Sequence, residues 1–159
     1  MILRSLGIST FVASVSAASS LCAQALLPLT VEFPSGAAVE LTLEDLDAMD
    51  QVAFTTTTIW TDGASEFSGV PLFVLLEALD VDGQTLKLSA LNDYSVEMPL
   101  AELDPDAPIL ATRIDGETMS IREKGPFWVM YPFDKSAEYQ TETNFARSVW
   151  QLKSLAIID

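Results

Sequence analysis

The sequence predicts a sheet-dominated α+β domain, and three observations lead to this fold class. The chain has 159 residues, a length that suits one domain with its own core. Apolar residues make up 49% of it, too many for a disordered chain. Many short β-rich runs are separated by turn residues, and only two stretches carry a helical pattern. No internal repeat or long linker indicates a second domain.

The predicted strands are runs dominated by β-branched, aromatic and other apolar residues, with turn residues between them. In chain order they are residues 29–33, 38–41, 52–60, 85–91, 94–98, 109–114, 117–121, 127–131 and 149–158. Pro34-Ser35-Gly36 joins the first two strands, and Asp62-Gly63 ends the third. Asn92-Asp93 and Asp115-Gly116 predict two hairpin turns, because such pairs favour tight reversals between strands.

The two predicted helices begin at residues that suit a helix N-terminus. Thr42 is expected to cap a helix over residues 43–49, whose first turn carries acidic side chains. Pro71 opens a helix over residues 71–79, because proline is tolerated in the first turn. The leucines of this second helix recur at helical spacing and predict a core stripe. Residues 134–145 are polar and are predicted to be irregular.

Residues 1–25 are predicted to form a cleaved secretory signal peptide. Arg4 supplies the positive charge, apolar and small residues follow over residues 6–18, and Ala23-Gln24-Ala25 is a small-x-small cleavage pattern. The apolar stretch is too short and too rich in serine for a good transmembrane helix, and an uncleaved anchor is the alternative. We therefore expect residues 26–159 to be a periplasmic domain that is not embedded in the membrane.

Composition excludes several classes of partner and site. The chain has 8 basic and 23 acidic residues, so its surface would repel phosphates and no nucleic acid is expected as a partner. The lack of histidine excludes Ser-His-Asp and Cys-His nucleophiles and His-ligated metals. Cys22, the single cysteine, lies in the signal peptide and lacks the flanking residues of a lipidation site. The exported domain therefore has no thiol.

Three stretches combine residues that suit a binding site, and each also has a purely structural interpretation. The threonines of residues 55–61 form either a half-exposed strand or a hydroxyl-lined pocket edge. The second stretch is residues 124–133, whose aromatic side chains either pack in the core or offer a stacking platform for a flat ligand. The third stretch is residues 147–152, in which Arg147 makes either a surface ion pair or a contact to an anion or carbonyl in a cleft.

Five short blocks follow one another between residues 55 and 155. They are Phe67-x-Gly69-Val70-Pro71-Leu72, Ala90-x-Asn92-Asp93-Tyr94, Ile109-Leu110-Ala111 with Asp115-Gly116, Gly125-Pro126-x-Trp128-x-x-Tyr131-Pro132, and Trp150-Gln151-Leu152. In this order they resemble the oxidoreductase molybdopterin-binding (sulfite-oxidase-like) domain, in its short exported bacterial form. The resemblance implies a mixed sheet or barrel with short helices and a cleft that holds a pterin cofactor.

The chain departs from this family where the metal would bind. The resemblance implies that the redox enzymes ligate molybdenum through a cysteine before the first block, and here residues 55–58 are all threonine. Without a thiolate the metal loses a main anchor, so we expect no metal. The basic cluster that grips the cofactor's phosphate in the family is also missing. Cysteine-free members resemble periplasmic pterin-binding proteins that regulate membrane sensors or cyclic-di-GMP enzymes.

We therefore expect a non-catalytic protein that binds a reduced pterin or a molybdopterin-like ligand and relays its occupancy to such a membrane partner. Two alternatives are a molybdenum-cofactor-dependent oxidoreductase without the cysteine ligand and a ligand-free interaction domain on the same fold. Aromatic rings would stack on the pterin, and polar side chains would bind its amino-pyrimidine edge. The candidate pterin-binding residues are Thr57, Trp60, Asp93, Tyr94, Trp128, Tyr131, Asp134 and Arg147.

Overall fold

The computed structural model describes residues 27–159, so the predicted signal peptide over residues 1–25 lies outside the described residues. The strands are β1 (Leu29–Glu32), β2 (Ala38–Leu41), β3 (Val52–Thr57), β4 (Ala64–Pro71), β5 (Thr85–Ala90), β6 (Ser95–Pro99), β7 (Ile109–Ile114), β8 (Glu117–Thr118), β9 (Trp128–Met130) and β10 (Leu152–Ile158). The helices are α1 (Leu43–Asp47), α2 (Leu72–Ala78) and α3 (Glu142–Arg147), with short 3₁₀ turns η1 (Leu100–Glu102), η2 (Ile121–Glu123) and η3 (Ala137–Tyr139).

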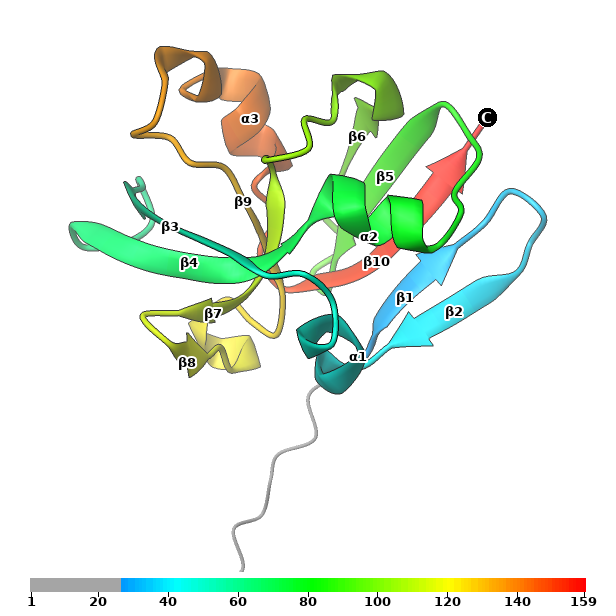
Figure 1. The fold of residues 1–159 in the computed structure, drawn as a ribbon, viewed down its shortest axis with the longest axis horizontal. Coiled ribbons are helices and arrows are strands. Elements are labelled where there is room, and N and C mark those ends of the chain that lie inside the picture. The colour runs from blue at the N-terminus through cyan, green and yellow to red at the C-terminus, as the bar shows by residue number, and fades with distance from the viewer. Residues whose placement is uncertain (1–26) are drawn as a thin grey trace, which may run out of the picture.

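The strands form two open sheets, with the β3–β4 hairpin at one end of the molecule and the β1–β2 hairpin at the other (Figure 1). The first sheet has the order β2-β1-β10-β5-β6, and the second has the order β3-β4-β7-β8, with β9 paired to β7. The predicted α+β class is confirmed at this level. Within residues 27–159, neither sheet closes on itself, so the barrel named as one form of the fold is not found there.

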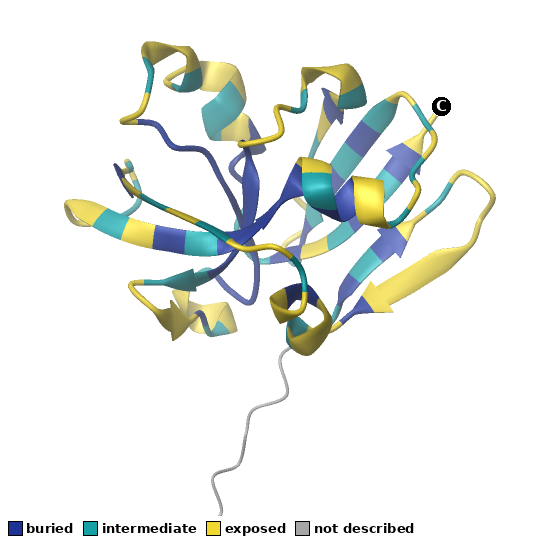
Figure 2. Ribbon diagram, in the orientation of Figure 1, coloured by how far each residue is buried: buried dark blue, intermediate teal, exposed yellow. Residues whose placement is uncertain are grey.

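The first and last strands lie side by side, since β1 pairs with β10 in parallel register. Every other strand pair in the two sheets is antiparallel. Figure 2 shows the buried residues concentrated where the two sheets face each other. The core draws on both, with Leu88 and Leu155 from the first sheet and Phe67, Leu110 and Trp128 from the second, all fully buried.

Strand β4 was not predicted, although it lies between β3 and β7 at the centre of the second sheet. Its residues include Gly69 and Pro71, which are poor strand formers, so propensity alone does not indicate a strand. The register shifts between Ser68 and Gly69 where β4 meets β7. A Cβ at Gly69 would collide with the backbone carbonyl of Leu110, so only glycine lets the two strands approach this closely.

Four other elements differ clearly from the prediction. The strand predicted over residues 52–60 ends at Thr57, and the one predicted over 117–121 is only β8. The final strand begins at Leu152, not at residue 149. Helix α3 lies in the stretch predicted to be irregular, and its N-terminus is capped by the Thr141 hydroxyl, which accepts a hydrogen bond from the Asn144 N–H at 3.1 Å. No helix within residues 27–159 is long and apolar enough to cross a membrane.

Candidate functional site

A pocket of about 250 Å³ opens where three segments that are distant in sequence meet. They are the turn after β3, the turn between β5 and β6, and the stretch from the end of α3 to the start of β10. The lining residues are Trp60, Ala90, Asn92, Tyr94, Phe145, Ala146, Ser148, Val149 and Trp150. None of these side chains is charged, and aromatic rings form much of the wall. We call this cavity the aromatic pocket.

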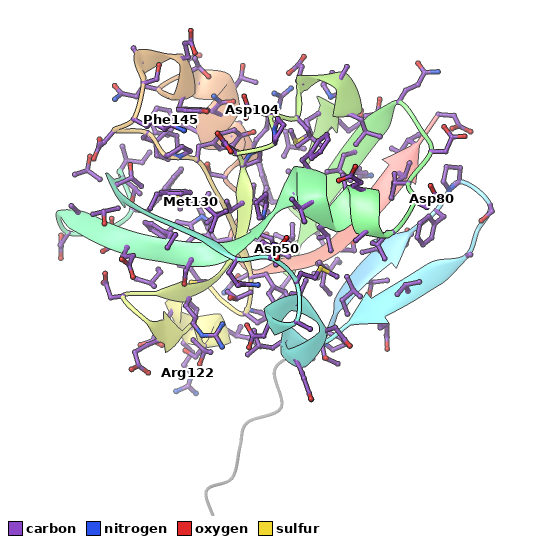
Figure 3. The ribbon with its side chains drawn as sticks, viewed as in Figure 1. Asp50, Asp80, Asp104, Arg122, Met130 and Phe145 are labelled. Atoms are coloured by element: carbon purple, nitrogen blue, oxygen red, sulfur yellow. The ribbon has the colours of Figure 1, made fainter. Side chains whose placement is uncertain are left out.

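Trp60 is the centre of the aromatic wall. Its ring centroid lies 5.7 Å from that of Trp150, and 5.9 Å from those of Phe145 and Trp128, all in edge-on geometry. Such pairs contribute roughly 0.5–1.5 kcal/mol each beyond the area they bury. Phe145 comes from α3 and is labelled in Figure 3. Trp60, Phe145 and Trp150 are half-buried, so this cluster keeps aromatic surface at the pocket.

Trp60 reaches the pocket because the chain turns directly after β3. The Thr58 hydroxyl accepts hydrogen bonds from the backbone N–H groups of Trp60 and Thr61, each at 3.0 Å. A threonine that bonds the backbone two or three residues ahead replaces the strand ladder with a turn. Gly63, at a φ of +75°, allows the chain to reverse into β4. These local bonds explain why the strand predicted to include Trp60 stops earlier.

Asp134 fixes the end of β3 next to this turn. Its carboxylate accepts a hydrogen bond from the Thr57 backbone N–H at 2.6 Å and from the Thr57 hydroxyl at 2.8 Å. The Asp134 N–H in turn donates to the Thr56 hydroxyl at 3.1 Å. The backbone N–H of Thr57, followed by its hydroxyl, lowers the pKa of Asp134. Thr57 and Asp134 are therefore brought together, but they bond to each other and do not line the pocket.

Polar groups line the pocket beside the β5–β6 turn. The Tyr94 hydroxyl donates to the Ala146 carbonyl at 2.9 Å, which ties this turn to the end of α3. The Asn92 side-chain oxygen accepts from the Tyr94 backbone N–H at 3.1 Å. The Ser148 hydroxyl donates to the Asn144 carbonyl at 2.8 Å. Each hydroxyl oxygen still has acceptor capacity, and the Asn92 amide has two donor hydrogens.

Trp128 and Tyr131 are core residues. Trp128 is fully buried, its indole N–H donates to the Ser148 carbonyl at 3.2 Å, and its ring packs edge-on against Phe67. It has no exposed face for a ligand, and its ring packs edge-on against the ring of Trp60. Tyr131 is also buried, and this burial raises the pKa of its hydroxyl to about 12, against the opposing effect of the Arg147 guanidinium.

Arg147 and Asp93 take part in ion pairs outside the pocket lining. Arg147 is buried, and its Nη1 lies 2.7 Å from a carboxylate oxygen of Glu102. Its Nε has no hydrogen-bond partner among the described residues. Asp93 is highly exposed and pairs with Lys153 at 3.2 Å. Of the eight predicted site residues, only Trp60 and Tyr94 therefore line the aromatic pocket.

The residues missed by sequence reasoning are Asn92, Phe145, Ser148 and Trp150. Asn92 and Trp150 belong to two of the five motif blocks, so a signal for them was present. Phe145 lies in the stretch predicted to be irregular, and nothing local marks it. Lys124 begins one of the three stretches singled out in the sequence but was not among the candidate residues. Its ammonium lies 5.4 Å from the Trp150 ring centroid and 5.7 Å from that of Trp128. This cation–π contact holds Trp150 in place from outside the lining.

Comparison with known proteins shows what this architecture is similar to. No protein-family model matches the chain, and no curated protein sequence matches it. The crystal structure of the sulfane dehydrogenase SoxCD from Paracoccus pantotrophus is similar with a TM-score of 0.64 and 22% identity. The match covers 84% of this chain and only 38% of that chain. The likeness shows that the two chains share a fold.

Proposed function

We propose that this chain is a non-catalytic, exported pterin-binding protein that reports the occupancy of its pocket to a membrane signalling partner. The observation that carries the proposal is the aromatic pocket, which places Trp60, Phe145 and Trp150 beside the polar groups of Asn92 and Tyr94. A pterin is a flat heterocycle with donors and acceptors along one edge. An aromatic wall beside a polar rim is the surface that recognises such a molecule.

The size of the pocket and its aromatic lining suit a compact ring system. A volume of about 250 Å³ lies just below the roughly 300–1,000 Å³ typical of pockets for drug-sized ligands. Stacking of a nucleobase on an aromatic side chain contributes roughly 1–3 kcal/mol, and a pterin ring has comparable flat faces. Trp60 and Trp150 keep solvent-accessible ring surface on which a ligand can stack, whereas Trp128 is fully buried.

The polar rim complements the edge of a pterin. Asn92 can donate its amide hydrogens to the ring carbonyl, because its side-chain oxygen is already used by the Tyr94 backbone N–H. The Tyr94 hydroxyl donates to Ala146 and keeps a lone pair that can accept from a pterin N–H. A ligand bound at micromolar concentration needs about −8 kcal/mol, so stacking and these hydrogen bonds must act together.

The side chains available as metal ligands do not fit a molybdenum ion that is anchored by a cysteine thiolate. The segment where the family places its cysteine consists of four threonines, and the only cysteine of the sequence precedes residue 26. Within residues 27–159, no group of three or more Cys, His, Asp or Glu side chains is arranged to hold a metal ion. The threonine hydroxyls are weaker, harder ligands than a thiolate. These residues favour ligand binding over metal-based redox chemistry.

The absence of charge in the lining favours a pterin without a phosphate group. All nine lining side chains are neutral, so a phosphate would find no counter-ion in the pocket. The sequence carries a formal net charge of −15, which adds long-range repulsion. The Lys124 ammonium lies against the indole rings of Trp150 and Trp128. A reduced, unphosphorylated pterin is therefore the ligand class that we propose.

Direct titration tests the pocket. The exported protein is titrated with a tetrahydropterin under anaerobic conditions by calorimetry. We expect Trp60→Ala to weaken binding at least about tenfold, because one stacking surface is lost. Ile59→Ala is the matched control, since Ile59 lies in the same turn, is 73% exposed and does not line the pocket. Equal affinities of wild type and Trp60→Ala would contradict the proposed site.

The bound ligand can be identified after purification. Protein exported in a bacterial host that makes both pterins and molybdenum cofactor is denatured, and the extract is assayed for pterin fluorescence and molybdenum. Pterin without metal supports the proposal. Equimolar molybdenum would contradict it and would require a metal anchor other than cysteine. An empty extract together with no binding in the titration would leave only the ligand-free interaction domain.

Export and the signalling partner are proposed from the sequence. Fusion of residues 1–30 to alkaline phosphatase tests export, and an inactive fusion would contradict a periplasmic location.

The relay to the signalling partner is tested in cells by measuring the cyclic-di-GMP level with wild type, Trp60→Ala or Ile59→Ala as the only copy of this chain. We expect only Trp60→Ala to change the cyclic-di-GMP level. The same level in all three strains would contradict a relay through a cyclic-di-GMP enzyme.

A further inference from the structure

A second concave surface lies between α2 and η1 and shares no residue with the aromatic pocket. It is a groove of about 230 Å³. Its lining consists of five apolar side chains and one carboxylate, which are Phe73, Leu76, Glu77, Val81, Leu100 and Leu103. We call it the α2–η1 groove.

The groove exposes apolar surface that the core does not use. Leu72, Leu75 and Leu76 form the buried stripe of α2, whereas Phe73 remains 37% exposed. Exposed residues are visible on α2 in Figure 2. Glu77 lies four residues after Phe73, so both belong to the same outer face of the helix. An exposed aromatic ring joined to other half-buried apolar side chains is typical of an interaction surface.

One carboxylate lies in this apolar surface, and three more are close to its lining residues along the chain. Glu77 lies in the groove itself, and Asp80 and Asp82 follow directly after α2. On the other side of the groove, Leu103 follows η1 and lines the groove, and Asp104 comes directly after it. Asp80 and Asp104 are labelled in Figure 3 on the two loops concerned. All four are exposed, so their charges remain available to a partner.

Basic side chains balance only one side of this rim: Lys135 lies 3.7 Å from a carboxylate oxygen of Asp106, two residues after Asp104. Among the described residues, Glu77, Asp80 and Asp82 take part in no ion pair. Lys87 is the only basic residue between positions 72 and 106. It alternates along β5 with the buried Leu86 and Leu88, which places it on the opposite face of the sheet. Arg147 is buried and already paired with Glu102. The groove is therefore apolar at its centre and negatively charged at its edge.

We propose that the α2–η1 groove docks a segment of a partner protein that carries an apolar anchor side chain flanked by lysine or arginine. The anchor buries against Phe73 and Leu103, and the cations face Glu77 and Asp80. Opposite charge at the rim steers the segment and rejects acidic segments, while the apolar contact supplies most of the affinity. The surface stands apart from the aromatic pocket, so docking does not require that the pocket bind a pterin.

Site-specific photo-crosslinking in the host cell tests this assignment. The residue p-benzoylphenylalanine replaces Phe73 in the full chain, and the same residue replaces Ile121 as a control. Ile121 is 41% exposed and lies on η2, outside the groove. We expect a protein crosslink at Phe73 and none at Ile121. Mass spectrometry of the crosslinked peptide should show an apolar residue flanked by Lys or Arg.

Charge reversal gives an independent readout. Glu77→Lys in the Phe73 crosslinking chain should reduce the yield about fivefold, because the rim charge is inverted. Glu97→Lys makes the same charge change at an exposed position on β6, outside the groove, and should leave the yield unchanged. Equal melting temperatures of the two variants show that the fold is kept. No crosslink at Phe73 would overturn the proposal, as would a crosslink to an acidic segment, to lipid, to a second copy or to residues 1–26.

Discussion

Asp134 accepts two hydrogen bonds from Thr57, at 2.6 Å from the backbone N–H and at 2.8 Å from the hydroxyl. The two residues are 77 positions apart in the sequence. This contact holds the end of β3 against the loop after β9 and thereby fixes the turn that carries Trp60. Thr57 and Asp134 do not line the pocket, but their contact influences where Trp60 lies in the pocket's aromatic wall.

The first prediction concerns this Asp134–Thr57 contact. Asp134→Asn removes the negative charge, so the turn after β3 should loosen and both the melting temperature and the affinity for a tetrahydropterin should fall. Asp62→Asn is the control, since Asp62 is an exposed aspartate in the following turn. Calorimetric melting and titration measure the two effects. An unchanged affinity in Asp134→Asn would show that this contact does not position Trp60.

The pH dependence of the same contact has a definite sign. The hydrogen bonds from Thr57 lower the folded pKa of Asp134 below the ordinary value of 3.8. The charged carboxylate therefore stabilises the fold above the unfolded pKa, and this stabilisation is lost as the pH falls through the lowered folded pKa. We expect the difference in melting temperature between wild type and Asp134→Asn to be full near pH 7 and to shrink below pH 3.8. A difference that stays constant down to the lowest measurable pH would contradict this.

Trp128 should matter for stability more than for ligand contact. The side chain is fully buried between Phe67 and Trp60, so Trp128→Ala leaves a large cavity and should lower the free energy of unfolding by about 3–5 kcal/mol. Urea denaturation measures the change. Trp60→Ala, at a half-buried position, should cost clearly less. Equal losses for the two variants would contradict the different burial of the two rings.

Gly69 tests the close approach of β4 and β7. Gly69→Ala adds a Cβ that would collide with the Leu110 carbonyl, so it should lower the free energy of unfolding by at least about 1–3 kcal/mol. Ser68→Ala, on the neighbouring position of the same strand, introduces the same side chain without such a collision. Urea denaturation of both variants gives the comparison. A Gly69→Ala protein as stable as Ser68→Ala would contradict the packing of these strands.

The ion pair between α1 and β7 should have only a small effect. Asp47 and Arg113 form two hydrogen bonds at 2.6 and 2.8 Å, but their side chains are 35% and 29% exposed. Arg113 lowers the pKa of Asp47, so the contribution to stability is present at neutral pH and is lost in acid. A double-mutant cycle with Asp47→Asn and Arg113→Gln should give a coupling energy of about 0.2–1 kcal/mol. A coupling above about 2 kcal/mol would contradict the solvent-screened setting of the pair.

Local patterns in the sequence predicted most of the elements but not all of them. Thr42 caps α1 as expected, through a hydrogen bond from the Asp45 N–H to its hydroxyl. The β5–β6 hairpin also forms about its predicted turn. Strand β4 escaped because its glycine and proline are poor strand formers. Pro71 lies past the last β4 residue that pairs with β3, so it has a strand partner only in β7. Helix α3 escaped because six polar and mixed residues carry no clear periodicity.

The aromatic pocket could be predicted only in part. The sequence indicated Trp60 and Tyr94, which both line it. It also indicated Trp128, because an aromatic residue in a motif looks the same whether its ring is exposed or buried. Burial depends on the neighbours that the other sheet and α3 supply, and these are remote in the sequence. For the same reason Phe145 carried no local sign of its position.

The sequence by itself determined the α+β class, the lack of cysteine and histidine in residues 27–159, and most strand and helix positions. These properties follow from composition and from short-range periodicity, which act within a few residues. The tertiary structure decided which aromatic side chains reach the pocket, that Thr57 and Asp134 bond to each other, and that the sheets stay open. Those outcomes depend on contacts between segments tens of residues apart, and packing and strand pairing select them only when the whole chain has folded.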